Sequence, residues 1–237
     1  IYVIEVNPRA SRTVPFVSKC IGTSPAKVAA RCRVGQTLKS QGFTKEIIPP
    51  YFSVKEAVFP FNKFPGIDPI LGPEMKSTGE VMGVGETFAE AYGKAELGAS
   101  DEIPSKGTAF ISVRERDKDQ VSDLAAKLTG LGFQLVATKG TADILKTSGI
   151  DVEIVNKVQE GRPHIVDMIK SDKIKLIINT TEGRQAISDS STIRSSAEQH
   201  RVYYTTTMAG GSAVCEALQF GGDIKVRNLQ TLHKGIS

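Results

Sequence analysis

The chain has 237 residues, of which 40% are hydrophobic and 24% charged, a balance typical of a globular protein with one large domain or two small ones. Its net charge of +4, from 30 basic and 26 acidic residues, is too small and too dispersed to indicate nucleic-acid binding, but it suits small anionic ligands. No stretch approaches the roughly 20 apolar residues that span a bilayer, so we expect no membrane partner.

The three cysteines, Cys20, Cys32 and Cys215, are far apart and form neither a C-x-x-C pair nor a Cys/His cluster. They predict small buried residues in a reducing compartment, not a disulfide framework or a zinc site. Residues 1–6 lack the basic leader and long apolar core of a signal peptide, and they predict a buried strand. Because the chain starts in this way without an initiator Met, we expect it to be a fragment of a longer protein.

Glu5 and Asn7 lie two residues apart on this first predicted strand, so their side chains point to the same side. A carboxylate and an amide in this arrangement can ligate a hard divalent cation, and the nearby Arg9 and Arg12 can face phosphates. The plainer alternative is a strand with a polar turn, in which Glu5 pairs with one of the arginines. The spacing alone favours this alternative.

Helical periodicity covers residues 16–21 and 24–34, where Ser24 and Pro25 supply an N-cap and a proline at the first helical position. After a pair of prolines, residues 51–59 predict a strand. This strand carries Glu56, whose default interpretation is a surface ion pair. The sharper alternative is a carboxylate that binds the ammonium group of a ligand.

Residues 60–85 are rich in proline and glycine, and an ordered loop of this length usually has a function. Residues 79–85 predict a short strand that closes the loop. Residues 87–97 predict a helix, capped by Thr87 and ended by Gly98. The polar, turn-rich stretch that follows, up to residue 107, is typical of a linker, so we divide the chain into residues 1–100 and 101–237.

Strands and helices alternate strictly after the linker. The predicted strands cover residues 109–113, 133–137, 152–155, 175–179 and 202–204, and the predicted helices cover residues 119–128, 142–148, 163–170, 189–200 and 211–218. Short apolar strands separated by helices predict an α/β fold with a five-stranded parallel sheet and helices on both faces. Ligands of such folds bind at the carboxyl ends of the strands.

The turn Thr138-Lys139-Gly140-Thr141 lies at one of these carboxyl ends, between a predicted strand and a predicted helix. Free backbone N–H groups and the positive end of the helix dipole point at one spot, surrounded by two hydroxyls and an ammonium group. The plainer alternative is a strand–turn–helix with threonine caps. Polar residues also follow the other strands, at Ser112, Arg114, Asn156, Lys157, 179–181 and 205–207. Their convergence favours an anion site at this edge of the sheet.

No catalytic machinery is obvious at this edge. His164, His200 and His233 lie near helix ends or the terminus, and we expect them to be structural or exposed, not general bases. The sequence has no G-x-S-x-G motif, and residues 79–85 match neither a Walker A loop nor a complete G-x-G-x-x-G fingerprint.

Longer motifs extend over essentially the whole chain. They are Glu5-Val6-Asn7-Pro8-Arg9, Arg12-Thr13-Val14-Pro15-Phe16, Ile48-Pro49-Pro50-Tyr51, Phe61-Asn62-Lys63-Phe64-Pro65-Gly66, Leu71-Gly72-Pro73-Glu74-Met75, Ser77-Thr78-Gly79-Glu80-Val81-Met82-Gly83, Asn156-Lys157-Val158, Glu160-Gly161-Arg162-Pro163-His164 and Ile178-Asn179-Thr180-Thr181. With these motifs the chain resembles the C-terminal part of the large subunit of carbamoyl phosphate synthetase.

The resemblance implies that residues 1–100 are the C-terminal piece of an ATP-grasp domain and that residues 101–237 are an allosteric domain with the fold of methylglyoxal synthase. The family makes carbamoyl phosphate from bicarbonate and glutamine-derived ammonia with ATP, for pyrimidine and arginine biosynthesis. In the full-length enzyme the implied cofactors are ATP, Mg²⁺ or Mn²⁺, and K⁺. We expect the fragment alone to be inactive, because the parts that cover adenine and triphosphate are missing.

The resemblance also implies partners and a compartment. The partners are the rest of the synthetase chain and a glutaminase subunit or domain, together with the effectors UMP, IMP and ornithine, in an oligomer. The compartment is the bacterial cytoplasm or the stroma of an organelle such as a plastid.

The resemblance further assigns roles to single residues. Glu5 and Asn7 match the positions that hold the divalent metals on ATP, and Arg12 matches a catalytic phosphate contact. Glu56 and Thr206 match positions that bind the activator ornithine between the two domains. The positions that match the UMP or IMP pocket are Ser112, Lys118, Thr138, Thr141, Lys157, Asn179 and Thr181.

Three positions qualify these implications. Lys139 stands where family members often have His, and it adds a permanent positive charge beside the phosphate. Thr205 stands where an acid is expected beside Thr206, which weakens the expectation of ornithine activation. Lys157 favours a nucleotide ligand, because the ammonia-dependent, N-acetylglutamate-activated type has Trp there and this chain has no Trp.

Two alternatives belong to other classes of function. One is a stand-alone phosphate lyase of the methylglyoxal synthase kind, which the sequence disfavours because the loop of residues 161–164 lacks the expected aspartate. The other is a non-catalytic domain that serves mainly as an oligomerisation surface.

Overall fold

The structure, a computed structural model, describes residues 11–58, 79–221 and 225–236. The predicted first strand, with Glu5 and Asn7, and most of the proline- and glycine-rich loop lie outside the described residues. Among the helices of the described part, none is both long and apolar enough to cross a membrane.

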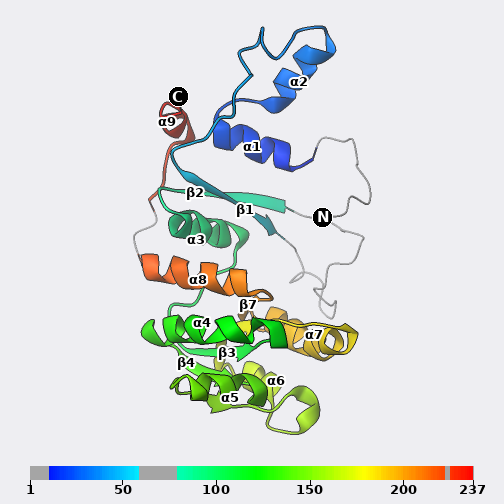
Figure 1. Ribbon diagram of the computed structural model, residues 1–237, viewed down its shortest axis with the longest axis vertical. Coiled ribbons are helices and arrows are strands. Elements are labelled where there is room, and N and C mark those ends of the chain that lie inside the picture. The colour runs from blue at the N-terminus through cyan, green and yellow to red at the C-terminus, as the bar shows by residue number, and fades with distance from the viewer. Residues whose placement is uncertain (1–10, 59–78, 222–224, 237) are drawn as a thin grey trace.

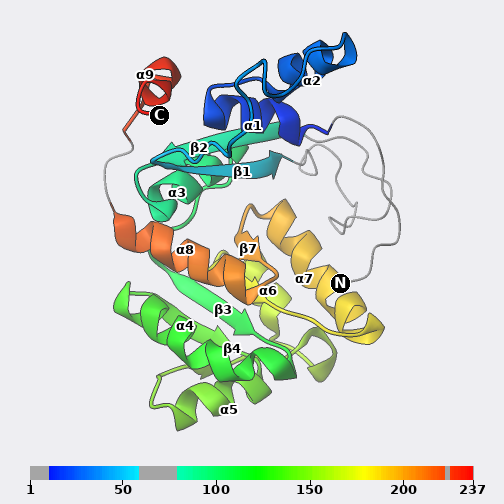
Figure 2. The ribbon, with the colours of Figure 1, turned by 45° about the horizontal axis from the view of Figure 1, so that its top comes forward.

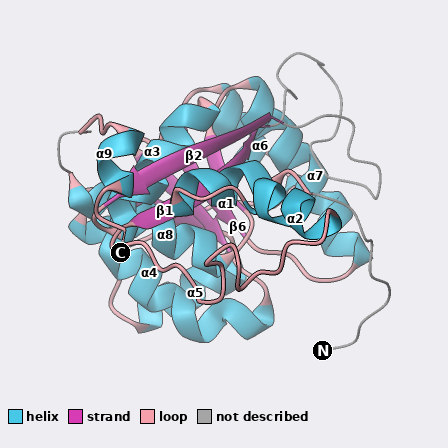
Figure 3. Cartoon of the chain, turned by 90° about the horizontal axis from the view of Figure 1, so that it is seen from above, coloured by secondary structure: helices cyan, strands magenta, loops and turns pink. Residues whose placement is uncertain are grey.

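The first part of the chain forms two helices, a pair of strands and a third helix. They are α1 (Thr13–Ile21), α2 (Pro25–Arg33), β1 (Phe52–Val58), β2 (Gly79–Gly85) and α3 (Phe88–Ala99). The strands pair antiparallel, and α1 and α2 lie above them (Figure 3). The predicted caps are confirmed, because the Ser24 hydroxyl accepts a hydrogen bond from the Lys27 N–H and the Thr87 hydroxyl accepts one from the Glu90 N–H.

The prediction that Gly98 ends α3 is wrong. The helix continues to Ala99, and Ser100 forms the C-cap with a left-handed φ of 70°. A Cβ at Gly98 would lie 3.3 Å from the Val81 side chain on β2. The glycine therefore allows close packing inside the helix and does not terminate it.

The second part contains the predicted five-stranded parallel sheet. Its strands are β3 (Thr108–Ser112), β4 (Gln134–Ala137), β5 (Glu153–Ile154), β6 (Ile174–Asn179) and β7 (Tyr203–Thr205). The strand order is β5-β4-β3-β6-β7, and every pairing is parallel. The chain thus builds outward from β3 to one edge and then returns to build the other edge, so β3 is the topological switch point.

Helices cover both faces of this sheet, as predicted (Figure 2). They are α4 (Lys118–Gly130), α5 (Lys139–Thr147), α6 (Ile165–Lys170), α7 (Arg184–Gln199) and α8 (Met208–Phe220). A last helix, α9 (Leu229–His233), and two 3₁₀ turns, Glu115–Asp117 and Val158–Glu160, have no counterpart in the predictions. The predicted buried face of α4 is confirmed at Val121, Leu124, Ala125 and Leu128.

Four predicted helix starts in the second part are wrong, including that of α8, which begins at Met208, three residues earlier than predicted. Helix α5 begins at Lys139, so the predicted turn of residues 138–141 is its N-cap and first turn. Helix α6 begins at Ile165 with His164 as N-cap, because the Asp167 carboxylate accepts the His164 N–H, and Pro163 precedes the helix. Helix α7 begins at Arg184, five residues earlier than predicted, in a polar stretch without helical periodicity.

Alternate strand residues feed two cores. Ala109 and Ile111 of β3 pack with α4, α5 and α8 on one face, whereas Phe110 packs with α6 and α7 on the other. All three residues are fully buried. This alternation is the period of a strand whose two faces are both covered, and it fixes which strand ends can meet at the site.

Helix α3 joins the two parts of the chain. It lies between the β1–β2 pair and α8 (Figure 1). The C-terminal segment also returns to the first part, where Arg227 bonds Glu86 at 2.8 Å and the His233 ring approaches the Lys19 carbonyl at 2.6 Å. The first and second parts are therefore held together by a central helix and a returning terminus.

Gly83 sets how closely α3 can approach β2. A Cβ at this position would lie 1.9 Å from the Ala91 carbonyl oxygen and 2.5 Å from the Ala95 nitrogen. We therefore expect Gly83→Ala to displace the helix and lower the free energy of unfolding by about 1–3 kcal/mol or more. The measurement is the midpoint of urea denaturation.

Gly130→Ala is the matched control, because Gly130 lies in the last turn of α4 with open space around its missing Cβ. This substitution should be neutral or stabilise the protein by up to about 1 kcal/mol. Equal effects of the two substitutions would contradict the packing account.

Candidate functional site

The candidate site lies at the carboxyl edge of the sheet, where β3 meets its neighbours β4 and β6. Ser112 ends β3 in register with Asn179, the last residue of β6. The Ser112 hydroxyl lies 3.0 Å from the hydroxyl of Thr138, which follows β4. Three of the predicted nucleotide-site residues are therefore brought together at the switch point.

Threonine hydroxyls hold the backbone that leaves β3. The Val113 N–H donates to the Thr141 hydroxyl oxygen at 3.2 Å, and the Arg114 N–H donates to the Thr180 hydroxyl oxygen at 3.0 Å. Both threonines are buried, with 2% and 4% of their surface exposed. Because buried N–H groups need partners, these bonds fix the three strand ends relative to one another.

The first turn of α5 faces this junction. Thr138 is the N-cap residue, but its side chain makes no capping bond and its hydroxyl faces Ser112 instead. The alternative of a threonine-capped turn is therefore wrong for this residue. The Thr141 N–H donates to the Thr138 carbonyl at 2.9 Å. The positive end of the α5 dipole and the N–H groups of Lys139 and Gly140 remain to attract an anion.

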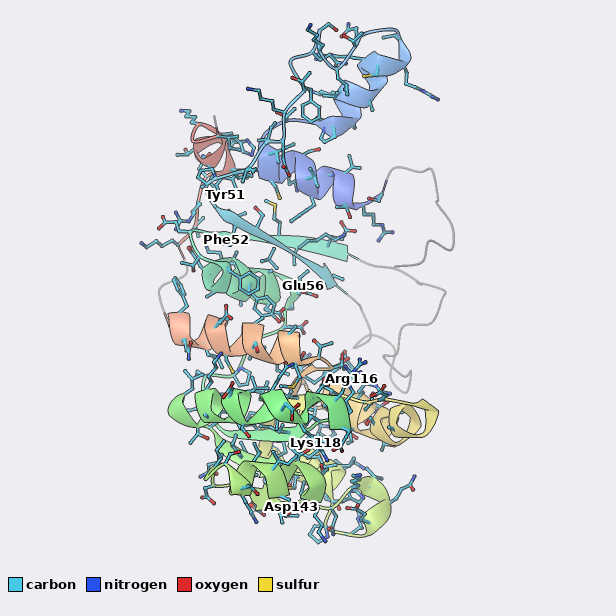
Figure 4. The ribbon with its side chains drawn as sticks, in the orientation of Figure 1. Tyr51, Phe52, Glu56, Arg116, Lys118 and Asp143 are labelled. Carbon is cyan, nitrogen blue, oxygen red and sulfur yellow. The ribbon has the colours of Figure 1, made fainter. Side chains whose placement is uncertain are left out.

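A lysine ammonium group lies beside the same turn. A Cβ at Gly140 would lie 3.9 Å from Nζ of Lys118, which extends from the start of α4 (Figure 4). Nζ also pairs with Glu115, whose side chain is 86% exposed. The cation therefore reaches the α5 N-terminus while its partner remains in water, where the ion pair is weak.

An ion pair supports the loop after β3. Arg114 Nε donates to Asp117 at 2.8 Å. Burial alone would raise the pKa of Asp117, but hydrogen bonds from the Thr180 hydroxyl and from Arg114 lower it. Thr180 is among the strand-end residues expected at this edge, whereas Asp117 was not predicted, although the Arg-x-x-Asp spacing at residues 114–117 indicates such a pair.

Asn179 carries a donor without a partner. The residue is 6% exposed, and its amide nitrogen has no hydrogen-bond partner among the described residues. A buried amide N–H₂ group left unpaired costs free energy, so such a group commonly serves a ligand. Its position at the end of β6 directs this donor to the same strand junction.

The remaining two residues of the predicted pocket lie farther out. Thr181 follows Thr180, and its carbonyl accepts a 3.5 Å bond from Arg114. Lys157 is exposed, and its backbone N–H donates to Glu160 at 2.8 Å. No described contact joins Lys157 to the other pocket residues, so the structure places it at the rim.

The residues assigned to ATP and metal are only partly described. Glu5 and Asn7 lie outside the described residues, and Arg12 is exposed at the N-cap of α1. Within the described ranges, no group of three or more His, Cys, Asp or Glu side chains is arranged to hold a metal ion.

The two residues assigned to ornithine lie on different parts of the chain. Glu56 is half-buried on β1, and Thr206 is exposed directly after β7. Burial raises the pKa of Glu56 most, its bond to the Ala57 N–H lowers it, and the charge of Asp101 raises it further. The described contacts connect their elements only indirectly, through Glu96 of α3 and Tyr203 of β7.

The three histidines are structural or exposed in the structure, as predicted. His164 caps α6, His200 contacts the Ser196 carbonyl of its own helix, and His233 contacts the Lys19 carbonyl. None of them lies at the strand junction.

An open cavity of about 390 Å³ occurs at the opposite, amino-terminal edge of the sheet. Its lining combines acids and bases from the starts of three strands, namely Glu102, Pro104, Ser105, Lys106, Asp172, Lys175, His200, Arg201, Val202 and Tyr203. Lys175 already pairs with Asp172 at 2.6 Å. The carboxyl edge has an unpaired buried donor, the Asn179 amide, whereas Lys175 in this cavity already has a partner. We therefore favour the carboxyl edge as the functional site.

Comparison with known proteins agrees with this architecture. Residues 120–206 match the MGS-like domain family. Over 236 residues, all of this chain, the sequence is 66% identical to the carbamoyl phosphate synthase large chain of Pseudomonas putida and 67% identical to that of Pseudomonas aeruginosa. Over its whole length the chain therefore matches a part of carbamoyl phosphate synthase large chains. It spans 22% of the length of these relatives.

More distant bacterial relatives match over nearly the same span. The carbamoyl phosphate synthase large chain of Vibrio cholerae is 61% identical over 233 residues, which are 98% of this chain and 22% of the relative. The resemblance stated from the sequence motifs is therefore confirmed. The match to the MGS-like domain family also confirms the methylglyoxal-synthase-like fold expected for the five-stranded sheet.

The Thr141 hydroxyl should be a strong support of the strand junction. In Thr141→Val the buried Val113 N–H loses its acceptor while the side-chain shape is kept, so we expect the free energy of unfolding to fall by about 1–3 kcal/mol. Thr147→Val is the control, because Thr147 is exposed on the same helix and bonds only the Asp143 carbonyl. Urea denaturation checks both, and an equal loss in the two variants would contradict the proposed role.

Proposed function

We propose that this chain is the regulatory end of a carbamoyl phosphate synthase large chain, in which residues 101–237 bind a nucleoside monophosphate at the carboxyl edge of the sheet. The observation that carries the proposal is the buried, unpaired Asn179 amide beside the uncapped first turn of α5. A phosphate needs several hydrogen-bond donors and a positive potential, and this junction supplies both.

Different residues of the junction would contact the phosphate and the other polar atoms of the nucleotide. The phosphate lies at the first turn of α5, where Thr141, Lys118 and Lys139 supply a hydroxyl and two positive charges. The Asn179 amide donates to an oxygen of the ligand, and the Ser112 and Thr138 hydroxyls reorient to meet it. Lys157 and Thr181 close the rim. UMP and IMP share the phosphomonoester that this arrangement recognises.

We further propose that residues 1–100 belong to the ATP-grasp domain that phosphorylates carbamate in the full-length enzyme. The carboxylate of Glu5 and the amide of Asn7 are oxygen ligands that suit Mg²⁺ or Mn²⁺ on ATP, with K⁺ as a further ion. Arg12 would contact a phosphate as the catalytic cation. The relatives are several times longer than this chain, so we expect the chain alone to be inactive.

The proposed partners follow from the same matches. They are the remainder of the synthetase chain and a glutaminase that supplies ammonia, assembled as an oligomer in the bacterial cytoplasm. Ornithine is the proposed activator at the contact between the two parts, with Glu56 receiving its ammonium group and Thr206 its polar end. Thr205 in place of an acid weakens this second effector site.

A methylglyoxal-synthase-like lyase is the less favoured candidate. The loop of residues 161–164 contains no carboxylate. Asp167, the first acid after it, is bound by Arg162 and by the His164 N–H. The hydrogen bond from Arg162 is the first cause that lowers the pKa of Asp167, to about 2. A carboxylate held in this state is a poor general base.

Calorimetric titration with UMP and with IMP tests the nucleotide site. We expect Lys118→Ala and Asn179→Ala each to weaken binding by about tenfold to a hundredfold, because each removes one strong hydrogen bond to the ligand. Lys157→Ala should have a smaller effect, since Lys157 lies at the rim.

Lys146→Ala is the matched control, because Lys146 is an exposed lysine in the last turn of the same helix α5. It should leave the affinity unchanged. Equal affinities in wild type, Lys118→Ala and Asn179→Ala would overturn the proposed site.

A further inference from the structure

Three hydrogen-bonded side chains cross the seam between α3 and β7. The Tyr203 hydroxyl of β7 donates to Glu96 of α3 at 2.9 Å, and the Tyr92 hydroxyl of α3 lies 3.2 Å from the Tyr203 hydroxyl. Because Tyr203 has one proton and gives it to Glu96, Tyr92 is the donor in the second bond. Glu96 is only 5% exposed, so this polar network is buried between the two parts of the chain.

Acidic groups from several elements surround Glu96. Glu56 faces it from β1, and Asp101 faces it from the connection after α3. Asp101 also acts on Glu198 of α7. The groups that act most strongly on Glu96 are thus these acids and the two neutral phenols, and none of them is a cation. Four carboxyl groups therefore meet at one seam.

Within the described ranges, no cation on the other elements that pack on α3 is among the groups that act on Glu96. Glu80 of β2 pairs with Lys55 of β1 at 3.5 Å. The charges of Glu216 on α8 and Lys127 on α4 both act on the thiol of Cys215 on α8. The basic groups of α3 and of the C-terminal segment, Lys94 and Arg227, are bound to Glu90 near the start of the helix.

The pKa values of all four acids at this seam are raised. Burial is the largest cause that raises the pKa of Glu96 from 4.5 to about 7. The charges of Glu56 and Asp101 contribute to this rise, and the hydrogen bond from Tyr203 opposes it. Burial also raises the pKa values of Glu56, Asp101 and Glu198. The charge of Asp101 further raises the pKa values of Glu56 and Glu198. Ionisation of Asp101 therefore disfavours ionisation of Glu56, Glu96 and Glu198, and ionisation of Glu56 disfavours that of Glu96.

We propose that the Tyr92–Tyr203–Glu96 network is a proton-operated latch, which holds α3 against β7 while Glu96 is neutral and loosens when Glu96 ionises. A neutral carboxyl group still accepts the Tyr203 hydrogen bond, so the contact survives while the buried charge disappears. Ionisation places an unpaired charge among three other acids. The proposal concerns this seam and does not depend on nucleotide binding at the carboxyl edge.

The direction of the pH effect follows from linkage. In an opened seam Glu96 has its ordinary pKa, so on a rise in pH the open form releases its proton first. The closed seam is therefore fully stable below about pH 4.5, weakens as the pH rises to about 7, and changes little above that value. Regulation that depends on contact between the two parts would then respond to pH near neutrality.

Hydrogen exchange on the full chain tests the latch. Amides of α3 and β7 are followed at pH 5 and pH 8, with correction for the intrinsic pH dependence of exchange. We expect their protection to fall by about tenfold or more between these values, since each unit of pKa difference corresponds to a factor of ten. Glu96→Gln, which keeps the acceptor without the charge, should abolish this fall.

Two further variants sharpen the test. Glu102→Gln removes an exposed acid just beyond the seam and should retain the wild-type pH dependence. Tyr203→Phe removes the donor to ionised Glu96, so it should lower protection more at pH 8 than at pH 5. A fall in protection that persists in Glu96→Gln would overturn the proposal.

A measurement on the wild-type chain covers the case in which Glu96→Gln fails to fold. With ¹³C-labelled glutamate, at least one carboxyl carbon should titrate close to neutrality. Titration of every glutamate in the ordinary range for exposed glutamates would overturn the latch directly.

Discussion

The structure depends on the strand order around β3: β4 and β5 are added on one side of it and β6 and β7 on the other. The carboxyl ends of β3, β4 and β6 and the start of α5 therefore lie close together. A parallel sheet buried on both faces leaves only its edges for chemistry, and the switch point is where loops diverge and leave room for a ligand. Here the junction is held by buried hydrogen bonds from Val113 and Arg114 to threonine hydroxyls. The residues that stabilise the fold thus also lie at the candidate site, where the Asn179 amide has no described partner and the N-cap side chain of α5 makes no capping bond.

Helix α3 is the second constraint, because it transmits contact between the two parts. The pKa values of its two buried glutamates, Glu90 and Glu96, are shifted in opposite directions. Burial would raise the pKa of Glu90, but bonds from Lys94, the Glu86 N–H and Arg227 lower it to about 2, so its contribution persists above pH 4.5 and is lost only as the pH falls toward 2. Glu96 has no such cations and its pKa rises. One end of the helix is therefore a constant attachment and the other is sensitive to protons.

Helices and strands that follow a local pattern of apolar and turn residues could be predicted from the sequence. The four buried positions of α4 follow helical periodicity, and the strands of the five-stranded sheet follow apolar runs bounded by turn residues. The anion site was predicted because the carboxyl ends of parallel strands must meet. The predicted residues Ser112, Thr138 and Asn179 lie together in the structure, and no described contact joins Lys157 to them. Anion binding by these residues stays a prediction.

The features that the sequence did not predict depend on contacts between distant residues. Gly98 resembles a helix stop, but its lack of a side chain serves packing against Val81. The Tyr203–Glu96 bond joins residues 107 positions apart, and no local pattern indicates it. Helix α9 is short, and the C-terminal segment that carries it is held to the first part by Arg227 and His233. Such contacts require knowledge of how the two parts pack.

Mapping of amide chemical shifts tests the central claim that the carboxyl edge of the sheet is the effector site. The ¹⁵N-labelled chain is titrated with UMP, and with inorganic phosphate as the minimal ligand. The account predicts that the largest shifts occur at Gly140, Thr141 and Thr180 and at the side-chain amide of Asn179. Largest shifts at the opposite edge, around Lys106, Lys175 and Arg201, or no shifts at high ligand concentration, would contradict it.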